Sequence, residues 1–171
     1  LNVASQSIAS GAQHLMSLID NVLDQARFEA GEMALHNDPV DLVVLMADIQ
    51  AMFAPLAEQK GLRLDLQSSL PEPCWVEVDG MRLRQLLINL CNNAVKYTDS
   101  GSVELLSTYT DGQFSFVVKD TGPGIAEQEQ QFIFNAFHRV ASQSAKAGAG
   151  LGLAISQQIL EMMGGGLVLQ S

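Results

Sequence analysis

Two amides and an ammonium group stand at helical spacing near the middle of the chain. Asn89, Asn93 and Lys96 occupy positions i, i+4 and i+7, so on a helix with about 100° per residue they form one polar stripe. A partly buried amide needs a hydrogen-bond partner, because an unpaired buried polar group costs about 1–3 kcal/mol. The stripe is therefore either a satisfied polar patch or exposed flank, or a site for a metal ion and an anion.

A carboxylate and two glycines follow a predicted strand in the segment Asp120-Thr-Gly-Pro-Gly-Ile125. A carboxylate at the end of a strand can accept a hydrogen bond from the amino group of a flat base. The glycines would let the backbone approach the ring closely. The simpler interpretation is a turn that begins at the aspartate. The segment alone does not decide between them.

A glycine-rich segment, Gly148-Ala-Gly-Leu-Gly-Leu-Ala-Ile155, joins a predicted loop to a predicted helix. Backbone N–H groups at the start of a helix can bind phosphate. The segment lacks the Gly-Lys-Ser/Thr of a P-loop, and its spacing does not fit a dinucleotide-binding fingerprint. Taken alone, it is weak support for a phosphate site.

Helices and strands must position these three segments. The polar stripe belongs to a predicted helix over residues 81–98, whose other side is apolar. A second helix is capped by Asp41 and ends at Lys60-Gly61, after a break at residues 37–39. This order of elements indicates an α+β sandwich, with one sheet and helices on one face. The remaining predictions are helices at 1–30, 127–137 and 151–163, strands at 62–66, 76–78, 102–110, 114–118 and 167–170, and a loop at 138–149.

The first thirty residues predict a helix with a heptad seam and a C-terminal cap at Gly31. The seam favours a helical hairpin or a dimeric bundle over a helix packed on its own domain. Its residues are spaced by four and three in alternation: Ile8, Ala12, Leu15, Ile19, Val22 and Ala26.

Composition limits the function further. The chain has 171 residues, of which 47% are apolar, enough for one domain with a real core and an appendage. The formal charge of −10 argues against a nucleic-acid-binding surface. Neither a secretory signal nor an apolar run of membrane-spanning length is visible. Cys74 and Cys91 are predicted to be buried thiols in a reducing cytosol, and the start at Leu1 suggests an excised fragment.

The order of the motifs resembles the ATP-binding domain of sensor histidine kinases. Asn-x-x-x-Asn-Ala-x-Lys-Tyr-Thr comes first, then Asp-x-Gly-x-Gly-Ile, Phe134-x-x-Phe137 and Gly-x-Gly-Leu-Gly-Leu. The resemblance implies the Bergerat ATPase fold, which is shared with gyrase, MutL and the heat-shock ATPases (the GHKL superfamily). Leu23-Asp24 and Phe28-Glu-Ala-Gly31 look like the second helix of the dimerisation and histidine-phosphotransfer domain of hybrid-type kinases.

The expected architecture is therefore a two-layer α/β sandwich with a mixed sheet and helices on one face, preceded by one long coiled-coil-like helix. Residues 1–35 would be the partial second helix of the dimerisation bundle. Residues 36–171 would be the catalytic ATP-binding domain without its final strands, which would leave a sheet edge exposed.

The resemblance also assigns roles to residues. Asn93 looks like the ligand of a Mg²⁺ ion, while Asn89 and Lys96 would steady the phosphates of ATP. Tyr97 would lie beside the nucleotide, and Asp120 would hold the adenine amino group. The other expected ATP-binding residues are Gly122, Gly124, Ile125, Phe137, Gly148, Ala149, Gly150, Leu151 and Gly152.

The lid is expected between His138 and Ala149, with Phe134 and Phe137 as its anchors. Arg139 lies where such kinases often place an arginine that can reach the γ-phosphate, so it completes the expected catalytic set with Asn89, Asn93 and Lys96. Two departures from the family pattern are Ala149 in place of a common Thr and Asn135-Ala136 in place of a common Glu-Pro.

Asn89 separates kinases from ATPases within this resemblance. The ATP-hydrolysing relatives have Glu there as the base that activates water, and an amide cannot take a proton. Transfer of the γ-phosphoryl group from ATP·Mg²⁺ to a histidine is therefore expected, in a cytoplasmic domain whose parent could be anchored in the inner membrane. The acceptor helix is absent from this chain, since His14, His36 and His138 lack the acidic neighbour of an acceptor histidine.

The expected partners are ATP, an acceptor helix of the same or a partner kinase, a response-regulator receiver domain and a second copy of the intact parent, but no nucleic acid. Three alternatives stay open. The first is a degenerate kinase that serves as a nucleotide-independent dimerisation or regulatory module. The others are a gyrase-type ATPase and a purely structural domain.

Overall fold

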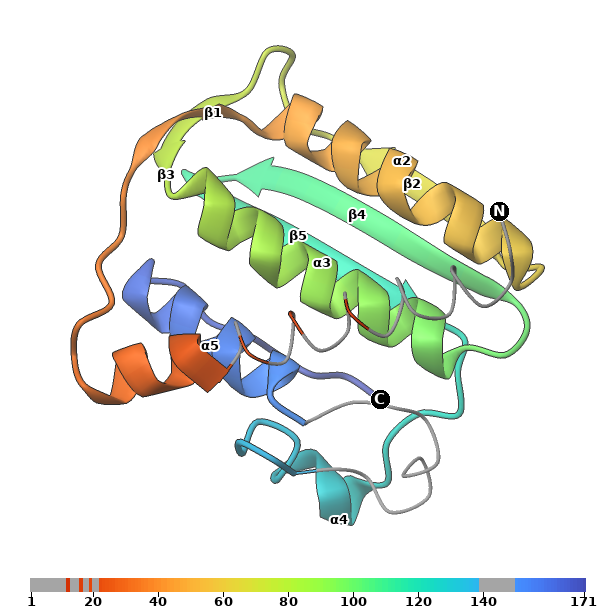
Figure 1. The fold of residues 1–171 in the computed structure, drawn as a ribbon. Helices are drawn as coiled ribbons and strands as arrows, with labels where there is room; N and C mark the ends of the chain where they lie inside the picture. Colours follow the sequence, from red (N-terminus) through yellow and green to blue (C-terminus); the bar gives the residue numbers. More distant parts are fainter. Residues whose placement is uncertain (1–11, 13–15, 17–18, 20–21, 139–149) are drawn as a thin grey trace.

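The structure is a computed structural model that describes residues 12, 16, 19, 22–138 and 150–171. Its helical layer consists of α2 (Leu42–Gln59), α3 (Gly80–Tyr97) and α5 (Gly152–Met162). Helix α3 lies between α2 and α5, and α2 and α3 cover one face of the strands (Figure 1). The strands are β1 (Asp38–Asp41), β2 (Arg63–Ser68), β3 (Trp75–Val78), β4 (Ser102–Thr110) and β5 (Gln113–Asp120).

Hydrogen bonds divide the strands into two ladders. Strand β4 is central in the larger one, where it pairs in parallel with β2 and antiparallel with β5. Strands β1 and β3 form a separate antiparallel pair. A tight turn at Asp111 and Gly112 joins β4 to β5, with φ values of 53° and 81° that suit the twist of a hairpin. The predicted fold class, an α/β sandwich with a mixed sheet, is confirmed.

Helix α3 is held at its start by a side-chain cap and along its length by an apolar face. Asp79 precedes the helix, and its Oδ1 accepts a hydrogen bond of 3.0 Å from the Arg82 backbone N–H. The apolar face packs into the core as the sequence pattern predicted. Its buried members are Leu83, Leu86, Leu87, Cys91, Ala94 and Val95.

Helix α2 has the length and composition that a membrane span would need, with a mean hydropathy of 1.2 over 18 residues. Its apolar stripe contacts β2 and α3, as in the core helix of a sandwich. Asp41 caps its start as predicted, accepting from the Val43 N–H at 3.0 Å. Gly61, with φ of +69°, lets the Leu62 N–H close the other end on the Ala57 carbonyl.

Three sequence predictions were wrong. The helix expected over residues 127–137 is a single turn, α4 (Glu127–Gln130), followed by turns. The segment has no continuous apolar stripe, since Ile133 is its one buried residue among 127–137. Residues 167–170 are not a strand, because no strand of the described residues pairs with them. The expected break at residues 37–39 instead leads into β1 at Asp38.

The N-terminal helix agrees with its prediction where it is described. Residues 22–29 are helical, and so are residues 12, 16 and 19. Gly31, with φ of +68°, closes the helix through a bond from the Glu32 N–H to the Arg27 carbonyl. The seam residues Ala12, Ile19, Val22 and Ala26 are exposed, while Ile8 and Leu15 lie outside the described residues. The domain boundary at residue 35 stays a prediction.

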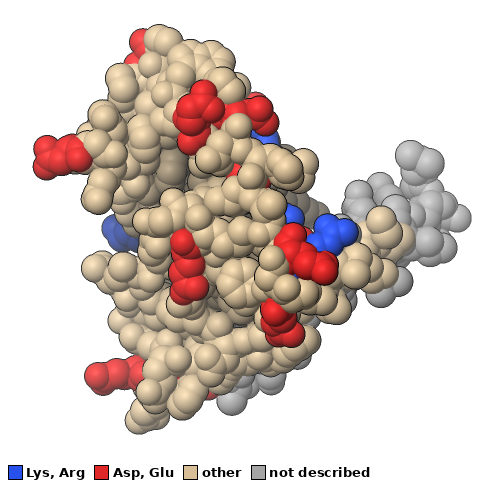
Figure 2. Space-filling model, turned by 90° about the vertical axis from the view of Figure 1, so that its left-hand side faces the viewer, with Lys and Arg blue, Asp and Glu red and all other residues tan. Residues whose placement is uncertain are grey.

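Charged groups are spread over the surface. On the face in Figure 2, Asp and Glu outnumber Lys and Arg and do not gather in one patch, in agreement with the net charge of −10.

The two cysteines are buried and unpaired, as predicted. Burial raises the pKa of the Cys91 thiol to about 12. Burial, together with the nearby Asp41 carboxylate, also raises the pKa of Cys74. Because the thiolate is the reactive form, we expect neither to react with an aromatic disulfide reagent at mildly alkaline pH until urea unfolds the chain. An S115C variant on the exposed part of β5 serves as the reactive control, and fast labelling of Cys91 in the folded protein would contradict this.

Candidate functional site

The polar stripe of α3 lies where the sequence predicted it. Asn89, Asn93 and Lys96 are half-buried along the edge of the helix next to its apolar face. Among the described residues, no hydrogen bond reaches the side-chain amide of Asn93. Its oxygen is therefore available to a hard cation, which prefers oxygen ligands and keeps waters and phosphate oxygens in its shell.

Asn89 connects α3 to the start of α5. Its Nδ2 donates to the Gly152 carbonyl at 3.5 Å, a long contact. A Cβ atom at Gly152 would stand 3.7 Å from the Asn89 Cγ, which is an ordinary van der Waals contact, so the start of the helix lies directly against the amide. The first turn of α5, with its unpaired backbone N–H groups, is thus brought next to the polar stripe.

Lys96 and Tyr97 interact at the end of α3. The Lys96 ammonium donates to the Tyr97 hydroxyl at 2.8 Å and also lies 4.4 Å from the centre of its ring. The pair forms a compact cationic and aromatic corner at the point where the helix ends.

Asp120 ends β5 beside the last residues of α3. Its Oδ1 accepts from the Gly122 backbone N–H at 2.8 Å and from the Thr98 hydroxyl at 3.4 Å. Thr98 is fully buried, while Asp120 is exposed. No described residue bonds to Oδ2, so one carboxylate oxygen is fixed by the protein and the other is open to a ligand.

Gly122 is required by this close approach. A Cβ atom there would come within 2.7 Å of the Asp120 Oδ1 and 3.1 Å of the Tyr97 carbonyl. Any side chain would therefore separate the Asp120 loop from α3. Two predicted site segments, whose contacting residues Thr98 and Asp120 are 22 positions apart, meet here through backbone and hydroxyl groups.

Gly124 and Ile125 continue the loop. Gly124 has φ of +71°, and the Ile125 N–H donates to the Ser171 hydroxyl at 2.6 Å. The Ile125 carbonyl accepts from Gln130 Nε2 at 2.9 Å, which ties the loop to α4. The C-terminal segment thus lies against the same glycine loop that follows Asp120.

Phe137 holds its place through its backbone rather than its ring. Its N–H donates to the Gly150 carbonyl at 3.0 Å, while its side chain is 64% exposed. Gly150 has φ of +72°, and a Cβ atom there would collide with the His138 carbonyl. The predicted lid anchor and the glycine segment, which lie on either side of residues 139–149, are therefore bonded to each other. The predicted site residues Arg139, Gly148 and Ala149 lie outside the described residues.

A polar cluster that the sequence did not predict joins the N-terminal helix to α3. Arg82 Nη1 lies 2.8 Å from Asp24 Oδ2 and also donates to Gln85 Oε1 at 2.8 Å. Gln85 Nε2 donates to the same Asp24 oxygen at 2.8 Å. Asp24 is 8% exposed. Leu23-Asp24 was noted for its resemblance to a kinase motif, but periodicity carries no information on a pairing across 58 residues.

The linker after this helix is fixed to the same end of α3. Asp79 Oδ2 accepts from the His36 N–H at 3.0 Å. Burial opposes ionisation of Asp79, but hydrogen bonds from the His36 and Arg82 backbones and the Arg82 charge outweigh it and lower the pKa of the carboxyl. The Asp79 carboxylate is thus ionised at neutral pH. It loses its charge only at a pH below the ordinary pKa of an aspartate.

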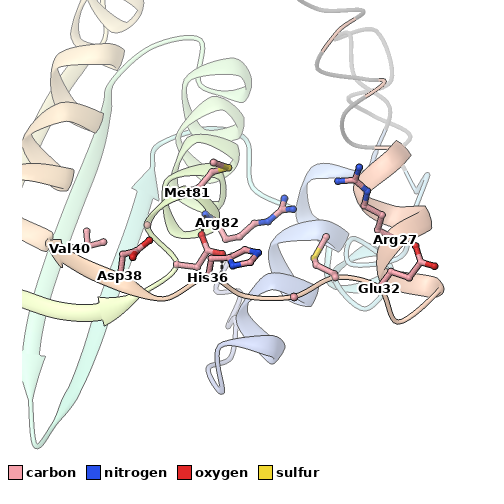
Figure 3. Close-up of a pocket in the computed structure, with 11 residues that line it drawn as sticks. Arg27, Glu32, His36, Asp38, Val40, Met81 and Arg82 are labelled. Atoms are coloured by element: carbon pink, nitrogen blue, oxygen red, sulfur yellow. Dashed lines mark hydrogen bonds between the residues drawn. The ribbon is translucent and has the colours of Figure 1, made fainter.

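A cavity of about 460 Å³ opens between the helix, the linker and the start of α3 (Figure 3). It is lined by charged side chains that include Arg27, Glu32, Asp38 and Arg82. None of the predicted nucleotide-binding residues lines it. The candidate site therefore lies where Asp120 and Gly122 contact the end of α3, and not in this cavity. The described residues hold no group of three or more His, Cys, Asp or Glu side chains suited to a metal ion.

The fold and these contacts define a class, a two-layer α/β sandwich in which a glycine-flanked aspartate meets the end of an amide-bearing helix. A family model described as "Histidine kinase-, DNA gyrase B-, and HSP90-like ATPase" matches residues 78–171, which is more than half of the chain. The chain belongs to this family.

Similar proteins define the branch. The aerobic respiration control sensor protein ArcB of Escherichia coli strain K12 is 38% identical over 170 residues, which cover 97% of this chain and 22% of ArcB. Full-length ShkA, solved in complex with AMPPNP, has a TM-score of 0.78 and 37% identity, covering 96% of this chain and 35% of ShkA. ThkA, solved in complex with the response regulator TrrA, has a TM-score of 0.70 at 23% identity, covering 96% and 46%, and supports the fold. The chain contains the ATP-binding catalytic domain of a sensor histidine kinase.

The polar cluster at the junction generates a test. An R82A variant removes the charged partner of the Asp24 carboxylate and leaves only the hydrogen bond from Gln85, at a cost of about 2 kcal/mol, below the value for a fully buried pair. We expect amide hydrogen exchange of residues 22–29 to rise about 30-fold.

The matched control is R84A, because Arg84 forms an exposed ion pair with Asp48, with side-chain exposures of 39% and 51%. Exchange in residues 22–29 should not change in that variant. Equal exchange in R82A and wild type would show that the cluster does not hold the helix.

Proposed function

We propose that this chain binds ATP·Mg²⁺ at the junction of α3, the Asp120 loop and the start of α5, and that the intact parent transfers the γ-phosphoryl group to a histidine. The observation that carries the proposal is the contact of Thr98 and Gly122 with Asp120 Oδ1. It leaves the second carboxylate oxygen for a ligand at the meeting point of two motifs.

Asp120 fits the base of the nucleotide. An ionised carboxylate accepts a hydrogen bond from the 6-amino group of adenine more strongly than a neutral acceptor does. Gly122, by lacking a side chain, keeps the loop close enough to α3 for a flat ring to face backbone on one side. Guanine, which has a carbonyl at that position, would meet the carboxylate with a repulsive pair of acceptors.

Asn93 fits a magnesium ion. Its amide oxygen has no protein partner among the described residues and lies on the same stripe as Lys96. Mg²⁺ when bound would neutralise charge on the phosphate oxygens. Lys96 and the first turn of α5 would hold the phosphates, and we place Arg139 at the γ-phosphate as a further stabilising charge.

Asn89 favours transfer over hydrolysis. An amide cannot act as the base that activates water, so the γ-phosphoryl group waits for another nucleophile. Phosphoryl transfer needs mainly positioning and charge stabilisation, which the amides and the ammonium can supply. A degenerate, nucleotide-independent module is disfavoured, since Asn93 and Asp120 are both intact.

The chain spans 22% of the length of ArcB, so the parent's partners are proposals too. We propose an acceptor helix of the same or a partner kinase, a receiver domain as phosphoryl acceptor, and a homodimer formed through the exposed seam of the N-terminal helix. The domain would work in the cytoplasm, where ATP is available.

Nucleotide binding is tested by D120N. The substitution keeps the shape of the side chain but removes its charge, so we expect the dissociation constant of a fluorescent ATP analogue to rise about tenfold or more. D111N is the matched control, because Asp111 sits in the β4–β5 turn with φ of 53°, a conformation that Asn also adopts. Binding that is unchanged in D120N would remove Asp120 from the site.

Phosphoryl transfer is tested by mixing the chain with a kinase chain that carries the acceptor helix and following the labelled γ-phosphate of ATP. We expect label on the acceptor histidine and none on His14, His36 or His138. An N93A variant should abolish transfer because it removes the proposed metal ligand, whereas N92A, an exposed neighbour on α3, should not.

Rapid steady-state release of phosphate without the acceptor chain would instead indicate a gyrase-type ATPase. Label on His14 of this chain would contradict the assignment of its first helix.

A further inference from the structure

Lys60 makes an unusual set of contacts at the end of α3. Its ammonium donates to the carbonyl oxygens of Val95 at 2.7 Å, Lys96 at 3.1 Å and Thr98 at 3.1 Å. An ammonium group has three donors, and all three are used on one stretch of backbone. The residue comes from the C-terminal cap of α2, which is 35 residues away from the first of these carbonyls.

The end of α3 needs such a partner. The last carbonyls of a helix receive no hydrogen bond from an N–H group within the helix, and many helices satisfy them with a glycine in a left-handed conformation. Helices α2 and α5 do so with Gly61 and Gly164, whose φ values are +69° and +75°. Helix α3 instead leads through Thr98, which is extended with φ of −86° and ψ of 122°. The Lys60 charge takes the place of the glycine cap and complements the negative end of the helix dipole.

The backbone that Lys60 holds carries two groups of the proposed base site, the Tyr97 carbonyl and the Thr98 hydroxyl. Thr98 is fully buried and donates to Asp120 Oδ1 at 3.4 Å. A Cβ atom at Gly122 would lie 3.1 Å from the Tyr97 carbonyl and 3.4 Å from the Thr98 Oγ1. A shift of a few tenths of an ångström at the end of α3 would therefore move the hydroxyl that orients Asp120 and the backbone against which its loop packs.

We propose that Lys60 is a positioning residue for base recognition: by fixing the end of α3 against the Asp120 loop, it sets the preference of the site for a 6-aminopurine. The inference rests on the proposed function, because it assumes that Asp120 receives the amino group. Lys60 itself touches no nucleotide in this scheme. It acts through Thr98 and the backbone around Tyr97.

A residue that only stabilised the fold would lower the affinity for every nucleotide alike. A positioning residue must change the ratio between nucleotides that differ at the base. ATP and ITP form such a pair, since inosine has a carbonyl where adenosine has the amino group.

The experiment measures the dissociation constants of ATP and ITP by competition with a fluorescent ATP analogue. The wild type should prefer ATP. In K60M, which keeps the aliphatic length but has no donors, we expect this preference to fall about tenfold, as for loss of a charged hydrogen bond. The matched control is K119M, because Lys119 is an exposed lysine with a 3.4 Å ion pair to Glu104, and its preference should equal that of the wild type.

K60R provides a second variant in case K60M does not fold. Its guanidinium keeps the positive charge at the helix end, so the fold is retained. Its planar fork cannot direct donors to three diverging carbonyls, and we expect a preference for ATP between those of K60M and the wild type.

The outcomes are distinct. A lower preference in K60M or K60R with a normal preference in K119M supports the inference. Equal losses for ATP and ITP, or an unchanged ratio in a folded variant, overturn it and leave the proposed function standing. A wild-type chain that binds neither nucleotide overturns the proposed function and this inference together.

Discussion

The position at which α3 ends determines the geometry of the whole site. The helix is fixed along its length by an apolar face between α2, α5 and the strands, and its last turn is bonded to α2 through Lys60. From that end, Thr98 and the Tyr97 carbonyl meet the Asp120 loop at distances that leave no room for a side chain at Gly122. The proposed metal and base contacts would therefore both depend on where this one helix ends, because Asn93 lies on it and the Asp120 loop packs against it.

The sequence predicted what depends on local periodicity and on short motifs. The apolar face of α3, the cap at Asp41 and the strand at residues 102–110 follow from the side-chain pattern and agree with the structure. The prediction of a helix over residues 127–137 was wrong because the scattered aromatic residues of this segment have the spacing of a helical stripe but no core that buries them. The end of the chain was wrong because a strand needs a neighbour, which periodicity does not reveal.

Contacts across long sequence separations could not be predicted. Lys60 stands beside a glycine in a helix-ending pattern, which predicted only that α2 ends there. Its use on three carbonyls of another helix depends on tertiary packing. The same holds for Asp24 and Arg82, which join the N-terminal helix to the first turn of α3. The N-terminal helix, which resembles a dimerisation element, is therefore bonded to α3, which bears the proposed catalytic amides. A displacement of the N-terminal helix would shift the start of α3.

The amide at Asn89 bears on how much ATP the parent kinase would consume between signals. Its Nδ2 contacts the Gly152 carbonyl, so the side chain links α3 to the start of α5. A site with that residue in place of a base would remain loaded with ATP while no signal arrives, because an amide cannot activate a water molecule for attack. Phosphorylation would then occur only when the acceptor histidine arrives at the site. A parent kinase that receives no signal would consume no ATP.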